Sequence, residues 1–321
     1  MQLTDPKGRM HQIVLQPGAS FHTHRGALSH DDLIGAPEGS VVTATSGTQY
    51  VALRPLLADF TLAMKRGATI VYPKDAAQIL VYADVFPGAR VLEAGAGSGA
   101  LSCWLLRAAG PDGEVVSFEA RADFAEIARE NVRKYFGEVP SWWRLVTAPL
   151  SARAALDPSV RTDRAYSLRK DPGLDVAADA PDDAGSDPGD PAGGGAPAAL
   201  PGTFDRVILD MLAPWENVAE AAQALIPGGL ICCYVATTTQ LSRVVEELRS
   251  HGSFYEPAAW ETLYRGWHVE GLAVRPDHRM IGHTGFLVTA RRLADGVTPP
   301  ARRRRPAKGS NPESDAESSS E

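Results

Sequence analysis

The chain has 321 residues, of which 44% are hydrophobic and 22% charged, so it has the composition of a soluble globular protein and room for more than one domain. Its 32 Lys and Arg face 39 Asp and Glu, which gives a net charge of −7. This acidity argues against a nucleic-acid partner, because Lys and Arg supply the contacts to phosphate. However, residues 171–200 hold seven Asp and no Lys or Arg, and without them the two signs are equal at 32 each. The net charge therefore does not exclude an RNA partner.

The pattern of apolar residues and cysteines excludes other classes. No run of about 18 apolar residues occurs, so we expect no membrane span. The first twenty residues lack the basic and then apolar pattern of a secretion signal. Cys103, Cys232 and Cys233 form no C-x-x-C pair and no metal-ligand spacing. We expect a cytoplasmic enzyme without a metal site.

The first 65 residues predict a small β domain. Short segments rich in β-branched residues, at 12–15, 40–44 and 49–53, are separated by Gly, Pro and Ser. His22 and His24, with an acidic pair further on, raise the possibility of a metal site. No third ligand lies at convincing spacing, so a turn or a polar surface between domains is the favoured interpretation.

From residue 89 the chain alternates between predicted strands and helices. The strands fall at residues 90–94, 114–119, 143–147, 204–210 and 229–236, and the helices at 100–109, 123–136, 216–225 and 238–250. Repeated βα units indicate an α/β fold with a doubly wound sheet. Two strand-like runs within residues 260–292 are expected to form a hairpin that adds an antiparallel edge strand. Residues 66–296 would thus form one large domain.

Two segments lie outside this pattern. In residues 171–200, 26 of 30 positions are Asp, Pro, Gly or Ala. Such a composition buries too little apolar surface to offset the entropy of ordering, so we expect a disordered insertion over about 155–202. We expect the same of the tail, residues 297–321.

The main chemical feature is a glycine loop at the end of the first predicted strand of the large domain. Gly95, Gly97 and Gly99 let the backbone turn and approach a ligand closely at a helix N-terminus. This spacing also fits a dinucleotide-binding loop. Glu93, however, would repel a pyrophosphate and suits a cationic amino group, and Glu119 is placed to accept hydrogen bonds from two ribose hydroxyls. S-adenosylmethionine is therefore favoured over a nicotinamide dinucleotide.

Two further segments point to the acceptor side of this site. Asp210 ends the strand at 204–210, where a doubly wound sheet opens into the same crevice as the glycine loop. Its carboxylate could accept a hydrogen bond from an exocyclic amino group, with Trp215 stacking on the base; alternatively, Asp210 caps a helix. Tyr72 could contact the acceptor base and Lys74 a phosphate, although Pro73 and Asp75 are also ordinary residues of a helix start.

Taken together, these motifs resemble the tRNA (adenine-58-N1)-methyltransferases of bacteria and archaea, particularly the actinobacterial branch. The resemblance covers nearly all of the chain outside residues 151–203 and the tail. The motifs that carry it are His30-Asp31-Asp32-Leu33-Ile34-Gly35, Pro37-Glu38-Gly39-Ser40, Tyr72-Pro73-Lys74-Asp75, Val91-Leu92-Glu93-Ala94-Gly95-Ala96-Gly97-Ser98-Gly99, Leu209-Asp210-Met211-Leu212-Ala213-Pro214-Trp215, Arg265-Gly266-Trp267 and Gly282-His283-Thr284.

The resemblance implies a Rossmann-like class I S-adenosylmethionine-dependent methyltransferase fold behind a small N-terminal β domain, and a homotetramer that binds tRNA. It implies methyl transfer to N1 of adenine 58 in the T-loop, with Asp210 and Tyr72 as catalytic residues. The expected cofactor-binding residues, from the resemblance and the loop together, are Glu93, Gly95, Gly97, Ser98, Gly99, Ala100, Leu101, Glu119, Arg121 and Asp210.

The chain departs from the family pattern in two places. Ala148-Pro149-Leu150 stands where the family usually has an acid near the cofactor adenine, so Ser151 or a residue of the insertion substitutes, or the contact is lost. Ala68-Thr69-Ile70 occupies the place of a frequent Gln. The alternatives to a tRNA methyltransferase are a methyltransferase for a protein or small molecule, an NAD-dependent oxidoreductase, and a non-catalytic RNA-binding subunit.

Overall fold

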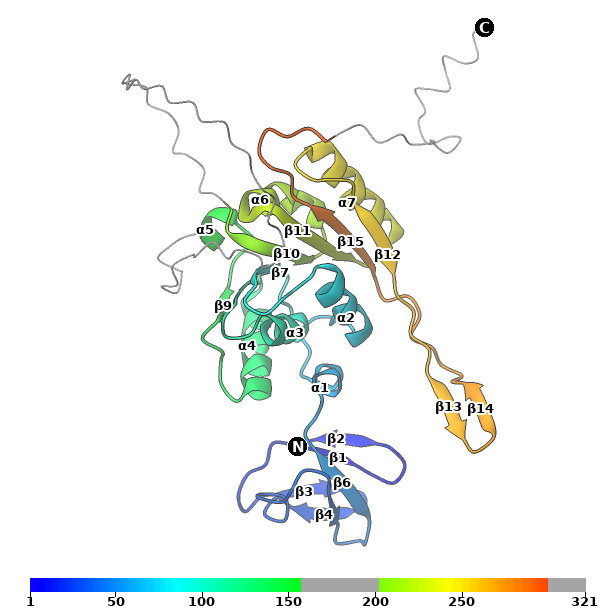
Figure 1. Cartoon of the computed structure of the whole chain (residues 1–321). Coiled ribbons are helices and arrows are strands. Elements are labelled where there is room, and N and C mark those ends of the chain that lie inside the picture. The colour runs from blue at the N-terminus through cyan, green and yellow to red at the C-terminus, as the bar shows by residue number, and fades with distance from the viewer. Residues whose placement is uncertain (157–201, 300–321) are drawn as a thin grey trace, which may run out of the picture.

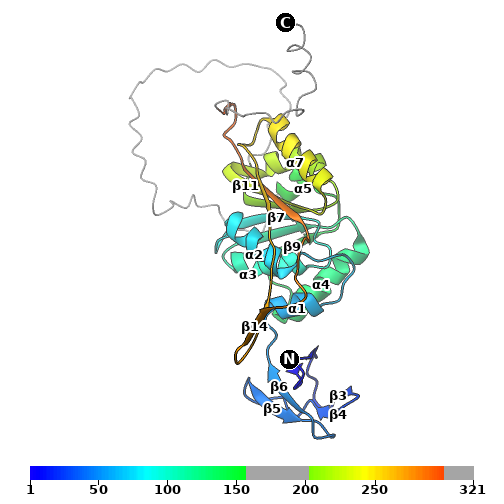
Figure 2. The ribbon, with the colours of Figure 1, turned by 90° about the vertical axis from the view of Figure 1, so that its right-hand side faces the viewer.

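The computed structural model describes residues 1–156 and 202–299, which form a small all-β unit followed by an α/β domain. In Figures 1 and 2 the β unit lies below the α/β domain. Most of the expected insertion and tail lies outside the described residues. Ala155 and Leu156, at the expected start of the insertion, belong instead to the end of a short helix.

The N-terminal unit is a four-stranded antiparallel sheet of order β2-β1-β6-β5 with a separate β3–β4 hairpin. The strands are β1 (Gln2–Thr4), β2 (Met10–Gln12), β3 (Ser20–Thr23), β4 (Gly26–Ser29), β5 (Ser40–Thr43) and β6 (Gln49–Leu53). The strand predicted at 12–15 lies at 10–12 instead. Gln12 already pairs with Gln2, the first residue of β1, so β1 has no further residue with which residues 13–15 could pair.

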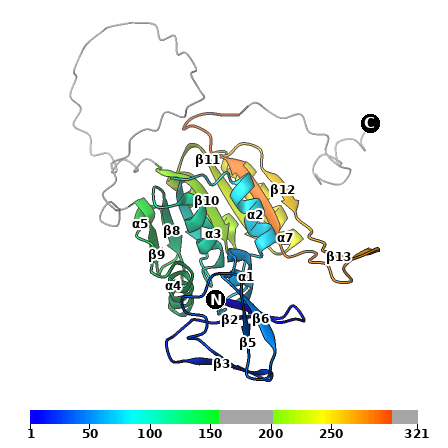
Figure 3. The ribbon, with the colours of Figure 1, turned by 60° about the horizontal axis from the view of Figure 1, so that its bottom comes forward.

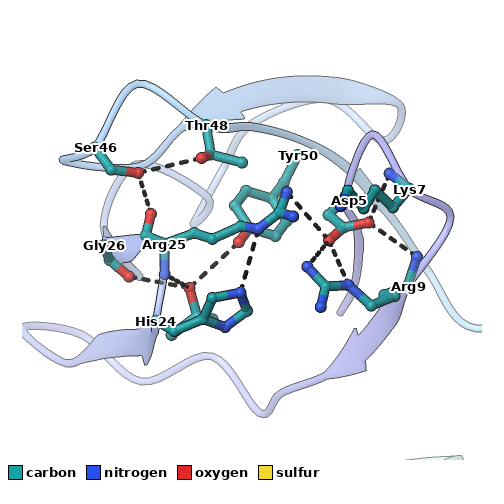
Figure 4. Close-up of polar contacts among 10 residues, drawn as sticks. Asp5, Lys7, Arg9, His24, Arg25, Gly26, Ser46, Thr48 and Tyr50 are labelled. Carbon is teal, nitrogen blue, oxygen red and sulfur yellow. Dashed lines mark hydrogen bonds and ion pairs between the residues drawn. The ribbon is translucent and has the colours of Figure 1, made fainter.

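A buried carboxylate organises the first turn of this unit (Figure 4). Asp5 Oδ1 accepts hydrogen bonds from the backbone N–H groups of Lys7 (2.8 Å) and Arg9 (3.0 Å), and Oδ2 accepts one from Arg9 Nε (2.9 Å). Arg25 Nη1 lies 3.6 Å from the same oxygen. Burial by itself would raise the pKa of Asp5, but the hydrogen bonds and the charge of Arg9 hold it at about 2.

The α/β domain is built on a seven-stranded sheet of order β12-β15-β11-β10-β7-β8-β9. Its strands are β7 (Arg90–Ala94), β8 (Glu114–Phe118), β9 (Trp143–Val146), β10 (Phe204–Asp210), β11 (Leu225–Val235), β12 (Ala258–Glu261) and β15 (Phe286–Arg291). The chain runs outward from β7 through β8 and β9, then returns to β10 on the other side of β7. The crevice for a ligand is therefore expected at the carboxyl ends of β7 and β10.

Helices cover both faces of this sheet (Figure 3). One core lies under α1 (Leu57–Ala63), α2 (Pro73–Tyr82), α3 (Ala100–Ala109) and α4 (Ala122–Phe136). The other lies under α5 (Ala152–Leu156), α6 (Val218–Ala224) and α7 (Thr238–His251). Leu57, Phe60 and Met64 belong to the first of these cores. We therefore propose a domain boundary near residue 55 rather than 65.

The C-terminal part differs from the prediction. β15 is antiparallel, as expected, but it lies between β11 and β12, so β12 forms the edge of the sheet. Between these two strands, residues 262–285 make a long excursion, which we call the arm. It carries the β13 (Trp267–Glu270) and β14 (Ala273–Pro276) hairpin, which projects away from the domain (Figure 1). Within the described residues, no helix is long and apolar enough to cross a membrane.

Candidate active site

The glycine loop lies where β7 and β10 end side by side. Leu209 of β10 pairs with Ala94 of β7, so Gly95 and Asp210 follow directly on neighbouring strands. Gly95 has φ +89°, and a Cβ there would overlap the carbonyl oxygen of Asp210. Only glycine fits this close approach, which brings the loop against the acidic end of β10.

Glu119 holds the loop from the neighbouring strand. Its Oε2 accepts a hydrogen bond from Gly97 N (2.8 Å), and its Oε1 accepts one from Arg121 N (3.0 Å). A carboxylate offers about four acceptor sites, so two remain for a ligand. The buried Glu119 can therefore fix the loop and still receive the two ribose hydroxyls of a nucleoside.

Glu93 lies deeper, with none of its surface exposed. Its Oε2 accepts hydrogen bonds from Ser102 Oγ (2.6 Å) and Ser117 Oγ (2.5 Å), while Oε1 is buried without a partner. Burial, with a smaller contribution from Glu119, raises its pKa to about 6. The contact of Glu93 with a ligand amino group stays a prediction, and Oε1 is the acceptor that remains for it.

Asp210 completes a group of three neighbouring carboxylates. Burial raises its pKa to about 7, and the negative charges of Glu93 and Glu119 add to the effect. A cation would relieve this repulsion, whereas a pyrophosphate would increase it. The residues present thus fit S-adenosylmethionine, which has a sulfonium, an ammonium and a ribose but no phosphate. They do not fit a nicotinamide dinucleotide.

Tyr72 stands directly before α2, with Pro73 at the first helical position. The segment that leads to it is tied to the glycine loop by Ser98, whose Oγ accepts hydrogen bonds from Gly67 N (3.0 Å) and Ala68 N (3.1 Å). The Ser98 hydroxyl is therefore engaged with this segment. Any contact from Ser98 to a cofactor would come from its backbone.

Other expected site residues contribute through their backbone or pack elsewhere. Ala100 and Leu101 are buried at the start of α3, in the core. The Arg121 side chain is exposed, pairs with Asp123 (3.0 Å) and lies 3.6 Å from the Phe124 ring centroid. Its backbone N–H, bonded to Glu119, is the part that reaches the site.

Two expectations from the sequence are wrong. The Lys74 side chain is only 6% exposed and is paired with Asp75, so it does not reach out to a phosphate. The guanidinium of Arg243 lies 4.2 Å from the ring centroid of Trp215, whose side chain packs against the core under α5, α6 and α7. Trp215 is therefore not free to stack on an acceptor base.

The structure also places Ser151, His22 and His24, for which the sequence leaves alternative roles open. Ser151 Oγ accepts a hydrogen bond from Ala154 N (3.4 Å) at the start of α5, and its remaining lone pair and O–H leave its substitution for the missing family acid a prediction. His22 and His24 are exposed. Across residues 1–156 and 202–299 no group of three or more His, Cys, Asp or Glu is arranged to hold a metal ion.

Tyr234 lies beside the candidate site and is not singled out by the sequence. It pairs in register with Asp210 on the neighbouring strand, and its hydroxyl donates a hydrogen bond to Asp75 (3.3 Å). In the sequence, Tyr234 is marked only as a tyrosine near the end of an otherwise apolar strand. Its position beside Asp210 depends on the register between β10 and β11, which the local sequence does not contain.

Comparison with known proteins agrees with this geometry. The chain is 32% identical over 290 residues to the tRNA (adenine(58)-N(1))-methyltransferase TrmI of Thermus thermophilus, covering 90% of this chain and 95% of the relative. This chain belongs to the tRNA (adenine-58-N1)-methyltransferase family. Residues 1–42 of this methyltransferase match the family described as TrmI-like N-terminal, and residues 50–144 and 189–274 match that of the tRNA methyltransferase complex GCD14 subunit.

An archaeal relative and a solved structure extend the comparison. The tRNA (adenine(57)-N(1)/adenine(58)-N(1))-methyltransferase TrmI of Methanocaldococcus jannaschii is 28% identical over 90% of this chain and 93% of its own. The crystal structure of tRNA (m1A58) methyltransferase TrmI from Aquifex aeolicus has a TM-score of 0.65 at 24% identity, covering 91% of this chain and 96% of its own. A SAM-dependent O-methyltransferase of Thermotoga maritima reaches 0.70 at 24% identity, over 95% of this chain and 94% of its own. These two structures confirm the methyltransferase fold.

Proposed function

We propose that this protein transfers a methyl group from S-adenosylmethionine to N1 of adenine 58 in the T-loop of tRNA. The observation that carries the proposal is the position of Asp210, an acidic residue at the carboxyl end of β10 whose backbone lies against the glycine loop. It can face a cofactor on one side and the amino group of an adenine on the other. The family membership supplies the tRNA and the position of the base.

The residues of the chain act mainly by alignment. The bound cofactor supplies a methyl group on a sulfonium, whose leaving group is a neutral thioether. Asp210 accepts a hydrogen bond from the adenine N6 amino group, which orients N1 and offsets the positive charge that develops on the ring. Alignment of this kind can supply about 7–11 kcal/mol of the barrier. The target base must turn out of the folded RNA to reach this position.

Asp210→Ala tests this role. The change should reduce single-turnover methylation sharply, by about 100-fold or more, because one group that stabilises developing charge is lost. Binding of tRNA should remain within a few-fold, since most of that affinity comes from phosphate contacts elsewhere. Undiminished methyl transfer by this variant would exclude the proposed role.

We also propose that the protein is a cytoplasmic homotetramer, as the family resemblance implies. The arm supports an assembly because six of its large apolar residues are more than half exposed: Leu263, Tyr264, Trp267, Val269, Leu272 and Val274. An exposed apolar surface of this kind is typical of a protein–protein contact. A second copy of the chain is the partner proposed for it.

A further inference from the structure

A buried polar network lies beside the acceptor side of the site and is centred on Asp75. This residue is 1% exposed, in the first turn of α2. Its Oδ1 lies 2.7 Å from Lys74 Nζ, and its Oδ2 accepts hydrogen bonds from Thr284 Oγ1 (2.5 Å) and Tyr234 OH (3.3 Å). Lys74 Nζ also donates to the carbonyl oxygen of Thr262 (2.6 Å).

The network joins three parts of the chain that are far apart in sequence. Lys74 and Asp75 begin α2, two and three residues after Tyr72, and Tyr234 lies near the end of β11. Thr262 directly follows β12, and Thr284 stands two residues before β15. These last two residues are the two ends of the arm. Both ends of the arm are thus fastened to the start of α2.

Tyr234 connects this network to Asp210. The two residues pair in register, so both side chains stand on the same face of the sheet. A Cβ at Gly285 would overlap the Tyr234 ring, so the ring packs tightly against the end of the arm. Burial raises the pKa of Tyr234, with further contributions from the charges of Asp75 and Asp210, so the phenol stays neutral and donates to Asp75.

We propose that Asp75 is a positioning residue for methyl transfer, which holds the Tyr72 segment, Tyr234 and the two ends of the arm in one arrangement around Asp210. The inference rests on the proposed function, because the acceptor base is what these three parts would surround. A buried ion pair is weak evidence for stability by itself, since apolar residues of similar size serve as well. Its value here is geometric, because one carboxylate fixes groups from separate segments.

Asp75→Asn is the first test, because it keeps the size of the side chain but leaves the Lys74 ammonium without a counter-charge. We expect single-turnover methylation of tRNA to fall by about 10–100-fold, in keeping with the effect of a displacement near 1 Å in an active site. The Kd for S-adenosylmethionine should stay within about twofold, since Glu119 and the glycine loop are not part of the network. Amide hydrogen exchange should rise at the two ends of the arm and not in residues 95–101.

Thr284→Val and Thr284→Ser give a milder pair for the case in which Asp75→Asn does not fold. The valine variant removes one hydrogen bond to Asp75 at nearly constant volume and should lower the methylation rate, and the serine variant should restore it. Lys65→Met is the matched control, because Lys65 forms an exposed ion pair with Glu130 (3.0 Å) outside the site, and it should leave the rate unchanged.

Two results would overturn the inference. One is an unchanged rate in both Asp75→Asn and Thr284→Val. The other is an equal loss of cofactor affinity and methylation, which would mean general destabilisation rather than positioning. Failure of the wild-type protein to methylate tRNA would instead count against the proposed function, whereas the hydrogen-exchange difference at the ends of the arm does not depend on the substrate.

Discussion

The surroundings of Asp210 disfavour its ionised form, which is the form that the proposed reaction needs. Its carboxyl group is partly removed from water and lies near two other carboxylates, so its ionised form is disfavoured until a cation binds beside it. The same arrangement makes the residue sensitive to pH near neutrality and costly for the stability of the protein without cofactor. Both consequences can be measured.

The activity should depend on the ionisation of Asp210. The ionised carboxylate can accept the hydrogen bond from the adenine amino group on either oxygen, whereas in the protonated acid one oxygen carries the proton. Because protonation of Asp210 weakens this acceptor, kcat/KM for the cofactor should fall as the pH decreases through about 7. The cationic cofactor favours the carboxylate, so the corresponding fall in kcat should occur at lower pH. A pH–rate profile of wild type and Asp210→Asn checks this, and a fall of equal size in the asparagine variant would assign the pH dependence to another group.

Stability should change in the opposite sense. The pKa of Asp210 is raised from 3.8 to about 7, so the folded state holds this proton more tightly and the free energy of unfolding decreases as pH rises between these values. Asp210→Asn lacks this loss and should be more stable than the wild type at pH 8, by at most about 4 kcal/mol, because the shift is about three pKa units and one unit corresponds to about 1.4 kcal/mol. The gain should shrink towards pH 4. Denaturant unfolding at both pH values measures it, with the exposed Asp123→Asn as a control that shows no gain.

Among the structural elements, the glycine loop between β7 and α3 has little space for added side chains. Gly95 and Gly99 both have positive φ, and a Cβ at Gly99 would lie 3.0 Å from the Cα of Ala128 in α4. The loop thus packs against β10 on one side and α4 on the other. Its shape depends on the absence of side chains at these two positions.

Gly95→Ala should therefore weaken cofactor binding. The new methyl group must displace the end of β10 that carries Asp210, so we expect the Kd for S-adenosylmethionine to rise by more than about tenfold, the equivalent of 1.4 kcal/mol. Gly137→Ala is a matched control, because Gly137 has the same φ of +89° but nothing within 4 Å of the added atom. It should lower thermal stability by about 1 kcal/mol and leave cofactor affinity unchanged. Isothermal titration of both variants compares the two.

The elements that the sequence predicted well are those with local signals. β7, α3 and β10 have the predicted bounds, because short apolar runs and flanking glycines mark their ends. Glu119 and Asp210 are predicted as site residues because each stands at the end of such a strand. The internal position of β15, the arm, the burial of Lys74 and the role of Tyr234 depend on pairing between distant segments, which single-sequence patterns do not contain.

At the scale of the whole molecule, the net charge of −7 has little bearing on RNA binding. Seven of the acidic residues lie within 171–200, outside the described residues, and the remainder of the chain is balanced. The protein combines a small β unit, a methyltransferase domain and a projecting arm. Contacts to tRNA and to other copies of the chain depend on how these three parts are placed.

The arm gives a test of the proposed assembly. Val269 and Val274 face each other across β13 and β14 and are 69% and 56% exposed. Replacing both with Asp should leave the hairpin intact but prevent its apolar contact with another copy. Light scattering should then give the mass of four chains for the wild type and a smaller assembly for the variant. An unchanged mass would place the assembly surface elsewhere.

The most direct test of the account is to locate the methyl group in the product. The purified protein would be incubated with methyl-labelled S-adenosylmethionine and unmodified tRNA, and the modified nucleoside and its position mapped by nuclease digestion and mass spectrometry. We predict label on N1 of adenine 58, and none when the same tRNA carries a different base at that position. Label on another nucleotide only, on protein, or on no macromolecule would contradict the proposed function.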